Sequence, residues 1–261
     1  GAQVKPQDYG QVFELGNARL SLHSAGHILG SAQVRIEVDG QVWVVSGDYK
    51  RDDDPSCAPF EVVPCDVFVT EATFGAPQYV WPPDGTASAE IFKWWTQNRA
   101  EGFASVLFCY ALGKSQRILA ELTRHTDETV YLHEAMTKLV GHYRRENIAM
   151  LPTRTVNECV HSFDFRGGLI LVPPHAFGTP WLKRLAPYKT GFASGWMGAD
   201  NGRAAKYARG FTLSDHADWP SLLRTIEETG ARRVLAMHGD TALLVRTLRE
   251  RGLDAAELGI A

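Results

Sequence analysis

The sequence predicts an α/β protein in which a β-rich domain is interrupted by an inserted α/β domain. Short runs that alternate apolar and polar residues, typical of half-buried strands, occur near both ends of the chain. Between them, apolar strand-like runs alternate with helical stretches, which is the pattern of a parallel sheet with crossover helices. We therefore expect residues 1–75 and 206–261 to form the β-rich domain and residues 76–205 to form the insertion.

The first β-rich segment is expected to be an antiparallel meander. Val, Phe and Ile alternate with polar residues there, and the Asp-Gly pair at 39–40 marks a turn between two strands. The strands expected in this segment are 11–15, 18–24, 33–38, 42–47 and 66–72.

The insertion and the closing segment are expected to contain both helices and strands. In the insertion we expect helices at 87–100, 113–125 and 134–148, and strands at 104–111, 129–133, 167–174 and 189–195. In the closing segment we expect strands at 210–216 and 232–240, and helices at 220–230 and 241–252.

Composition narrows the class of protein. Hydrophobic residues make up 44% of the 261 residues and charged residues 22%, values typical of a globular chain. No apolar run approaches the roughly 18 to 20 residues of a membrane span, and the first ten residues lack a signal-peptide pattern, so we expect a cytoplasmic protein without a membrane partner. The four cysteines are far apart and form no CxxC pair, which argues against a zinc–thiolate site.

Five residues at predicted strand ends could perform chemistry. They are His27, Asp48, Glu71, His216 and His238. Each has an ordinary explanation when taken alone, such as a turn, a helix cap or a hydrogen-bonded histidine. Together, imidazoles and carboxylates that converge from strand ends are typical of a zinc or manganese site. His23 competes with His27 for this role, but the glycines that flank His27 favour it because they allow a tight turn around a fixed side chain.

These residues stand in motifs that resemble those of metallo-β-lactamase-fold nucleases with a β-CASP insertion. The motifs are "AGHILGSA" around His27, "GD" at Asp48, "TEATFG" at Glu71, "SDHAD" at His216 and "HGD" at His238. Within that group the chain is most similar to the bacterial ligase-associated DNA exonucleases. The implied fold is a metallo-β-lactamase αββα sandwich, incomplete at its N-terminus, with an inserted β-CASP α/β domain.

The resemblance implies a role for each of these residues. It makes His27 a ligand of a first metal ion, His238 a ligand of a second, and Asp48 a bridge between the two, the ions being zinc or manganese. Glu71 would pair with His216, so that this histidine can protonate the leaving oxygen. Asp48, Glu71 and His216 are therefore the expected catalytic residues.

One family motif does not occur in the sequence. The resemblance implies a His-x-His-x-Asp-His segment that supplies two further ligands to each metal ion, and no such segment occurs in the 261 residues. We expect an upstream segment to carry it, and the chain on its own to be weak or inactive as a nuclease.

Contacts with substrate are expected from local basic residues, because a net charge of −3 gives no overall attraction to nucleic acid. The stretch "YALGKSQ" resembles a β-CASP segment that opens a helix, which makes Lys114 a candidate. Arg203 and Lys206 lie in a basic, Tyr-containing stretch that either contacts phosphates or is a solvated linker. His175 could face the site but is more simply explained as an exposed loop residue.

The expected function is that of a DNA exonuclease that hydrolyses phosphodiester bonds with a hydroxide activated by two metal ions. The family resemblance, and not the spacing of the residues, implies that the substrate is DNA and that the protein acts in repair with a ligase. A helicase is a further candidate partner. The alternatives are an RNA-processing nuclease of the same architecture and an inert fragment or scaffold that binds nucleic acid.

Overall fold

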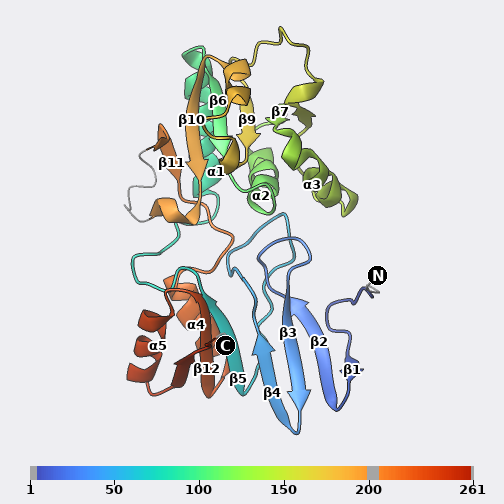
Figure 1. Cartoon of the computed structure of the whole chain (residues 1–261), viewed down its shortest axis with the longest axis vertical. Helices are drawn as coiled ribbons and strands as arrows, with labels where there is room; N and C mark the ends of the chain where they lie inside the picture. The colour runs from blue at the N-terminus through green and yellow to red at the C-terminus, as the bar shows by residue number, and fades with distance from the viewer. Residues whose placement is uncertain (1–4, 199–205, 260–261) are drawn as a thin grey trace. The chain divides into compact units, whose positions relative to one another are not determined.

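A computed structural model of the chain describes residues 5–198 and 206–259 (Figure 1). The described residues divide into two compact units. The first unit contains the chain up to Asp53, then Ala58–Val80, then the chain from His216 onward. The second contains Asp54–Cys57 and the described residues between Trp81 and Asp215. Each unit has its own sheet and its own hydrophobic core.

The sheet of the first unit has seven strands in the order β1-β2-β3-β4-β5-β12-β13. The strands are β1 (Phe13–Leu15), β2 (Ala18–Ser24), β3 (Ala32–Val38), β4 (Gln41–Val45), β5 (Val67–Ala72), β12 (Arg233–Gly239) and β13 (Asp254–Glu257). Pairing is antiparallel from β1 to β4, which confirms the predicted meander for these four strands. The fifth strand expected in the meander, β5, pairs with β4 in parallel, so that part of the prediction was wrong. Pairing from β4 through β5 and β12 to β13 is parallel, and β13 was not predicted.

Two helices pack on this sheet beside β12 (Figure 1): α4 (Trp219–Thr229) and α5 (Thr241–Glu250). The α4 helix begins where the Asp218 side chain accepts a hydrogen bond from the Ser221 N–H, at 2.9 Å, and ends at Gly230 with φ of 66°. Their apolar faces bury Ile226, Leu244 and Leu248 against one face of the sheet.

The sheet of the second unit has six strands, and every pair of neighbours is parallel. In sheet order these are β11 (Arg209–Phe211), β10 (Tyr188–Ala193), β6 (Ala104–Phe108), β9 (Leu169–Val172), β7 (Val130–Leu132) and β8 (Thr153–Thr155). The predicted parallel sheet is therefore confirmed. The short strand β8 was not predicted.

Helices cover one face of this sheet and short 3₁₀ segments cover the other. Leu107 of β6 faces the core formed with α1 (Thr86–Ala100), α2 (Lys114–Glu121) and α3 (Glu134–Arg145). Its neighbours Val106 and Phe108 face the second core, which includes residues of the segments η3 (Pro174–Ala176) and η4 (Pro180–Leu185). The described residues also include the 3₁₀ segments η1 (Leu122–Arg124), η2 (Val156–Glu158) and η5 (Gly195–Gly198).

The structure differs from the expected segment boundaries in three places: the first unit extends to Val80, Asp54–Cys57 belongs to the second unit, and the second unit ends at Asp215. The strand expected at 210–216 was assigned to the closing β-rich segment, but β11 pairs with β10 in the second unit. The ring of Phe211 packs edge-on against Trp94 of α1, with 5.5 Å between ring centres. The boundary therefore lies after Asp215 and not after residue 205. A short apolar strand does not by itself indicate which of two sheets it extends.

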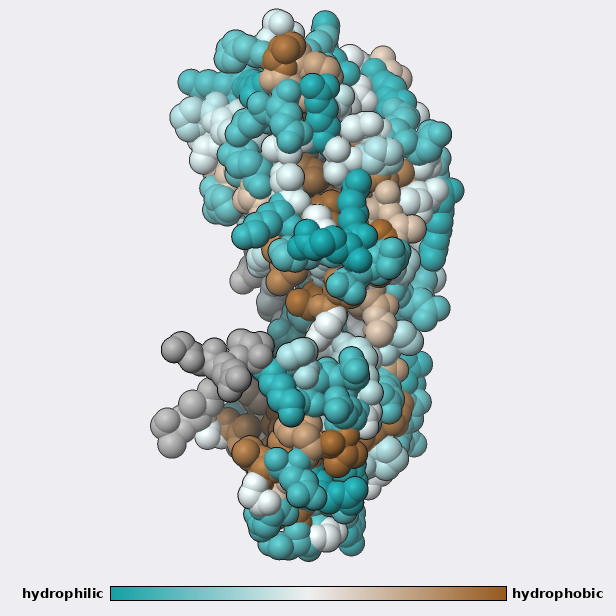
Figure 2. Space-filling model, turned by 90° about the vertical axis from the view of Figure 1, so that its right-hand side faces the viewer, coloured by the Kyte–Doolittle hydropathy of each residue, from teal (hydrophilic) through white to brown (hydrophobic). Residues whose placement is uncertain are grey.

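The face of the molecule in Figure 2 is largely hydrophilic, with hydrophobic residues in scattered small groups. Such scattered apolar residues are normal on a folded chain. Among the described helices, none combines the length and the hydropathy that crossing a membrane requires.

Candidate metal and acid–base site

The candidate site lies at one edge of the sheet of the first unit. Strands β2, β4, β5 and β12 run in the same direction, because β2 and β4 are both antiparallel to β3, whereas β4, β5 and β12 are mutually parallel. Their C-terminal ends therefore meet at the same edge. His27, Asp48, Glu71 and His238 lie at or just beyond these ends, which explains how segments far apart in the chain come together. His216 lies between β11 and α4.

The two carboxylate oxygens of Asp48 face two different histidines. Oδ2 lies 3.8 Å from Nε2 of His27, and Oδ1 lies 3.6 Å from Nδ1 of His238. The sequence predicted that these three side chains converge, and the distances agree with that. Both distances exceed the usual 2.7–3.2 Å range of an N–H···O hydrogen bond.

These distances fit a carboxylate shared between two cations. Two ligand atoms that bind one tetrahedral zinc ion at about 2.1 Å lie about 3.4 Å apart, close to the separations on either side of Asp48. Imidazole and carboxylate are also the donor types that zinc and manganese prefer. The donor set of His27, Asp48 and His238 therefore fits one divalent ion on each side of Asp48.

A second pair, Glu71 and His216, adjoins Asp48. Nδ1 of His216 lies 2.9 Å and 3.1 Å from the two oxygens of Glu71, and the carboxylate is almost fully buried. One ligand atom each from Asp48, Glu71 and His216 lies within 4.8 Å of the others. The ring of His216 also packs against that of His27, with 4.7 Å between centres. The pairing of Glu71 with His216 is as expected from the sequence.

The backbone of Tyr49 joins this pair to the loop that carries Asp48. Its N–H donates to Oε1 of Glu71 at 2.7 Å, and its carbonyl accepts from the N–H of Ala217 at 2.6 Å. The Tyr49 side chain is fully buried, and this burial raises its pKa above the ordinary value. Tyr49 is thus a structural residue of the site that the motifs did not indicate.

The loop after β2 holds His27 in a tight turn. Gly26 has φ of 67°, and a β-carbon on it would lie 2.5 Å from the carbonyl oxygen of Lys50. The Ser31 hydroxyl accepts hydrogen bonds from the N–H groups of His27 and Ile28, at 3.1 and 3.2 Å. The glycine was recognised from the sequence, but Ser31 was missed, although the position of a serine four residues after the histidine is typical of a side-chain-capped turn.

His238 lies at a β-bulge in β12. The pairing of β12 with β5 shifts register between Met237 and Gly239, so the intervening histidine is the extra residue. Its φ of 58° is in the left-handed region, which is uncommon for a residue other than glycine. The bulge turns the His238 side chain toward Asp48. No sequence pattern indicated this bulge.

Two other histidines that were candidates from the sequence have different surroundings. Nδ1 of His23 lies 2.8 Å from Glu61, and its Nε2 lies 2.9 Å from the Ser21 hydroxyl. His175 is exposed in the second unit, where its ring lies 6.0 Å from that of His133. His23 and His175 therefore have ordinary structural explanations.

The three basic residues that were expected to contact substrate differ in their surroundings. The ammonium of Lys114 is buried in an ion pair with Asp215, so the structure does not offer it to a phosphate group. Lys206 is exposed in the second unit, with its Nζ 5.1 Å from the ring centres of both Phe177 and Tyr207. Arg203 lies outside the described residues.

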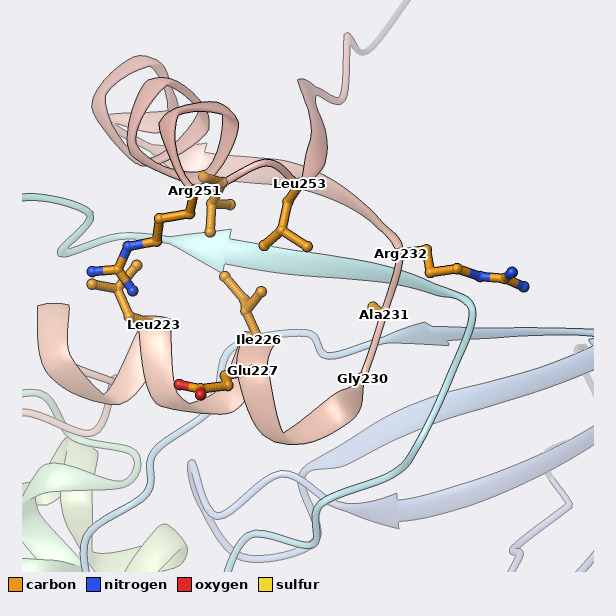
Figure 3. Close-up of a pocket in the computed structure, with 9 residues that line it drawn as sticks. Leu223, Ile226, Glu227, Gly230, Ala231, Arg232, Arg251 and Leu253 are labelled. Carbon is orange, nitrogen blue, oxygen red and sulfur yellow. The ribbon is translucent and has the colours of Figure 1, made fainter.

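A separate pocket of about 480 Å³ lies in the first unit between α4 and the residues that follow α5 (Figure 3). Ile226 and Leu253 point toward each other across it, whereas Arg232 points away. None of the candidate site residues lines this pocket, so it is separate from the metal and acid–base groups.

Comparisons with known proteins find similarity to proteins that are named as nucleic-acid enzymes. No family model matches it. It is 35% identical over 259 residues to a probable DNA ligase of Opitutus terrae, a match that covers 96% of this chain and 24% of that protein. It is 28% identical to the endoribonuclease ysh1 of Aspergillus fumigatus, covering 58% of this chain and 17% of the relative. An RNase J-like protein of Methanocaldococcus jannaschii is 29% identical and matches 40% of this chain and 25% of the relative.

The chain thus spans about a quarter of the length of these relatives, or less. A crystal structure of a protein of unknown function from Enterococcus faecalis V583 superposes on all of this chain and on 66% of that one, with a TM-score of 0.64 and 11% identity. That likeness concerns the fold alone. The relatives support the resemblance to metallo-β-lactamase-fold nucleases with a β-CASP insertion.

Proposed function

We propose that this chain carries the hydrolytic site of a metal-dependent nuclease. The observation that supports it most is the placement of Asp48, whose two oxygens face His27 and His238 while the Glu71–His216 pair stands beside them. Two divalent ions, zinc or manganese, would be held by His27 and His238, one each, and shared by Asp48. Such ions lower the pKa of a bound water and neutralise charge on a phosphoryl group.

The residues of the chain provide the proton for the leaving group. An ionised carboxylate only accepts hydrogen bonds, so Nδ1 of His216 carries the proton shared with Glu71. This leaves Nε2 as the atom that exchanges a proton with the substrate. In the imidazolium form Nε2 donates to the departing oxygen of the phosphodiester, and the buried carboxylate of Glu71 stabilises the positive charge.

We further propose that the substrate is DNA and the reaction exonucleolytic, in repair with a ligase. The relative named as a probable DNA ligase, which matches 96% of this chain, supports this assignment. On this proposal the first unit is the metallo-β-lactamase-like domain and the second is the β-CASP domain. The site of action would be the cytoplasm, and a helicase is a further candidate partner.

RNA processing is the second candidate function. The endoribonuclease and RNase J-like names of other relatives favour it. The phosphate chemistry is the same in both cases, so only groups near the 2′-hydroxyl can discriminate between the polymers.

Single-turnover cleavage of matched DNA and RNA oligonucleotides, labelled at either end, by the full-length protein tests these proposals. The assays contain zinc or manganese, and Asp48→Asn serves as the inactive control. We expect cleavage of DNA from one end, with mononucleotide products. Faster cleavage of RNA would favour the second candidate, and internal cuts would contradict exonuclease action. Binding of either polymer without metal-dependent cleavage would make the chain a scaffold and overturn the proposal.

A further inference from the structure

Three segments that carry residues of the candidate site contribute to one small hydrophobic cluster in the first unit. Each segment contributes one almost fully buried residue close to its site residue: Ala25 near His27, Tyr49 beside Asp48, and Ala217 beside His216. Leu222 of α4 also belongs to the cluster, and the ring of Phe60 packs against that of Tyr49 with 5.1 Å between centres. The packing of this cluster therefore affects the placement of the site residues.

Arg51 packs on the ring of Phe60 and binds α4. Its guanidinium lies 4.9 Å from the centre of that ring. Nη1 donates to the hydroxyl of Thr225 at 2.9 Å, and Nη2 lies 2.7 Å from Oε2 of Glu228. Thr225 and Glu228 are three positions apart, so they lie on the same face of the helix. The planar guanidinium contacts both side chains in one fixed geometry, which a lysine ammonium does not provide.

The α4 helix follows closely after the proposed general acid. His216 lies two residues before Asp218, the N-cap of α4, and all of these residues belong to the first unit. We propose that Arg51 is a positioning residue for His216. By holding α4 against the segment that follows Asp48, it fixes the general acid relative to the residue that bridges the two metal ions. This inference rests on the proposed function, and it adds a residue that no motif indicated.

The physical argument is that proton transfer depends strongly on position. A displacement of about 1 Å at a reacting group can cost roughly 100-fold in rate. The carbonyl of Tyr49 accepts from the N–H of Ala217 at 2.6 Å, which attaches the chain beside His216 at one point. Apolar packing of α4 on the sheet is not directional, so it fixes the orientation of the helix less closely than hydrogen bonds do. Arg51 supplies a second directional contact at Thr225, eight residues after Ala217.

The test is the substitution Arg51→Met in the full-length protein, which keeps an apolar stem and removes the guanidinium. We expect the single-turnover rate constant on labelled DNA to fall about 10- to 100-fold, with the affinity for DNA and the metal content unchanged. The matched control is Arg224→Met, an exposed arginine on α4, which should leave all three quantities unchanged. An unchanged rate constant in Arg51→Met, or a loss of metal that accounts for the lost rate, overturns the inference.

A double-mutant cycle shows whether Arg51 acts through His216. The loss caused by Arg51→Met should shrink to within about twofold when His216 is already replaced by alanine, because the group that Arg51 positions is then absent. A merely structural role would lower the rate by the same factor in both backgrounds. Equal factors would therefore overturn the inference.

The variant Glu228→Ala keeps the inference testable where Arg51→Met fails to fold. Glu228 is exposed, so its replacement should leave the fold intact, and Arg51 keeps its hydrogen bond to Thr225. We expect a smaller loss in the rate constant, again absent when His216 is alanine. An unchanged rate constant in Glu228→Ala, with Arg51→Met unfolded, overturns the inference. Failure of the wild-type protein to cleave would overturn the proposed function, and the inference with it.

Discussion

Glu71 engages a single nitrogen of His216, Nδ1, with both of its carboxylate oxygens, at 2.9 and 3.1 Å. The carboxylate is buried at the end of β5 and also accepts a hydrogen bond from the backbone N–H of Tyr49. A buried carboxylate in contact with an imidazole orients the ring and favours its protonated form. This arrangement supports the view that His216 acts through Nε2.

Replacement of His216 by alanine should slow the chemical step. General acid catalysis typically contributes about 100- to 10,000-fold, and we expect a loss in that range in single-turnover cleavage with little change in substrate binding. Glu71→Gln should also reduce the rate, because a neutral amide stabilises the imidazolium less. If His216→Ala weakens DNA binding and leaves the rate constant unchanged, His216 is a phosphate contact and not an acid.

Replacement of the proposed metal ligands should reduce metal content in a specific pattern. His27→Ala and His238→Ala should each lower the affinity for one ion, whereas Asp48→Asn should affect both, because its two oxygens face both histidines. Loss of a group that orients a metal ligand typically costs about 10- to 100-fold in metal affinity. Loss of a direct ligand should therefore cost at least about that. Metal per protein is measured by atomic emission after dialysis.

The matched control is His23→Ala, since His23 contacts Glu61 and Ser21 and not Asp48. A loss of metal in the His23 variant equal to that in the His27 variant would contradict the assignment.

Substitution of Gly239 should destabilise the bulge that carries His238. Gly239 has φ of +84°, and a β-carbon there would meet the Ala72 carbonyl group and lie 2.7 Å from Cα of Thr73. The control is Gly252→Ala, at φ of +85° with nothing within 4 Å of the added carbon. The control should lose about 1 kcal/mol from left-handed strain alone. Gly239→Ala should lose clearly more in the free energy of unfolding by urea, and should also bind less metal. Equal losses in the free energy of unfolding would mean that the backbone of Ala72 and Thr73 moves to accommodate the added β-carbon at no energetic cost.

Acid should weaken the start of α3 in the second unit. Nδ1 of His133 caps this helix by accepting from the Ala135 N–H, at 3.2 Å. Burial lowers the pKa of His133 below its ordinary value; the charge of Glu134 acts in the opposite direction, and His175 adds to the lowering. The unfolded chain therefore binds the proton more readily than the folded chain. The stability that this residue contributes is present above about pH 6.5 and is lost as the pH falls through the lowered pKa.

The test compares the wild type with His133→Asn, because asparagine caps a helix without titrating near neutral pH. We expect the wild type to lose about 1 kcal/mol relative to this variant between pH 7 and pH 5, which is roughly the contribution of a helix cap. Urea unfolding at several pH values measures the difference, and His161→Asn, at an exposed position, is the control. A pH-independent difference between wild type and His133→Asn would show that the cap survives protonation.

The sequence by itself determined the class of fold and the chemical character of the site. Alternation of apolar and polar residues is a local property, so it predicted the meander from β1 to β4 and the parallel sheet of the second unit. Each candidate site residue had an ordinary explanation when taken alone, and the resemblance of its motif to a known family made His27, Asp48 and His238 the expected metal ligands. Short strands such as β8 and β13 carry too few residues for periodicity to identify them.

Tertiary structure alone decided which of these residues meet and how they are held. The common direction of β2, β4, β5 and β12 places their C-terminal ends at one edge, and that direction depends on pairing between strands far apart in the sequence. The bulge that turns His238 toward Asp48 arises from the register of β12 against β5. The burial of Lys114 against Asp215 joins residues 101 positions apart, and it withdraws the ammonium from the phosphate contact expected from the sequence. Burial and long-range pairing depend on the whole fold, because each requires a partner that no short stretch of the chain contains.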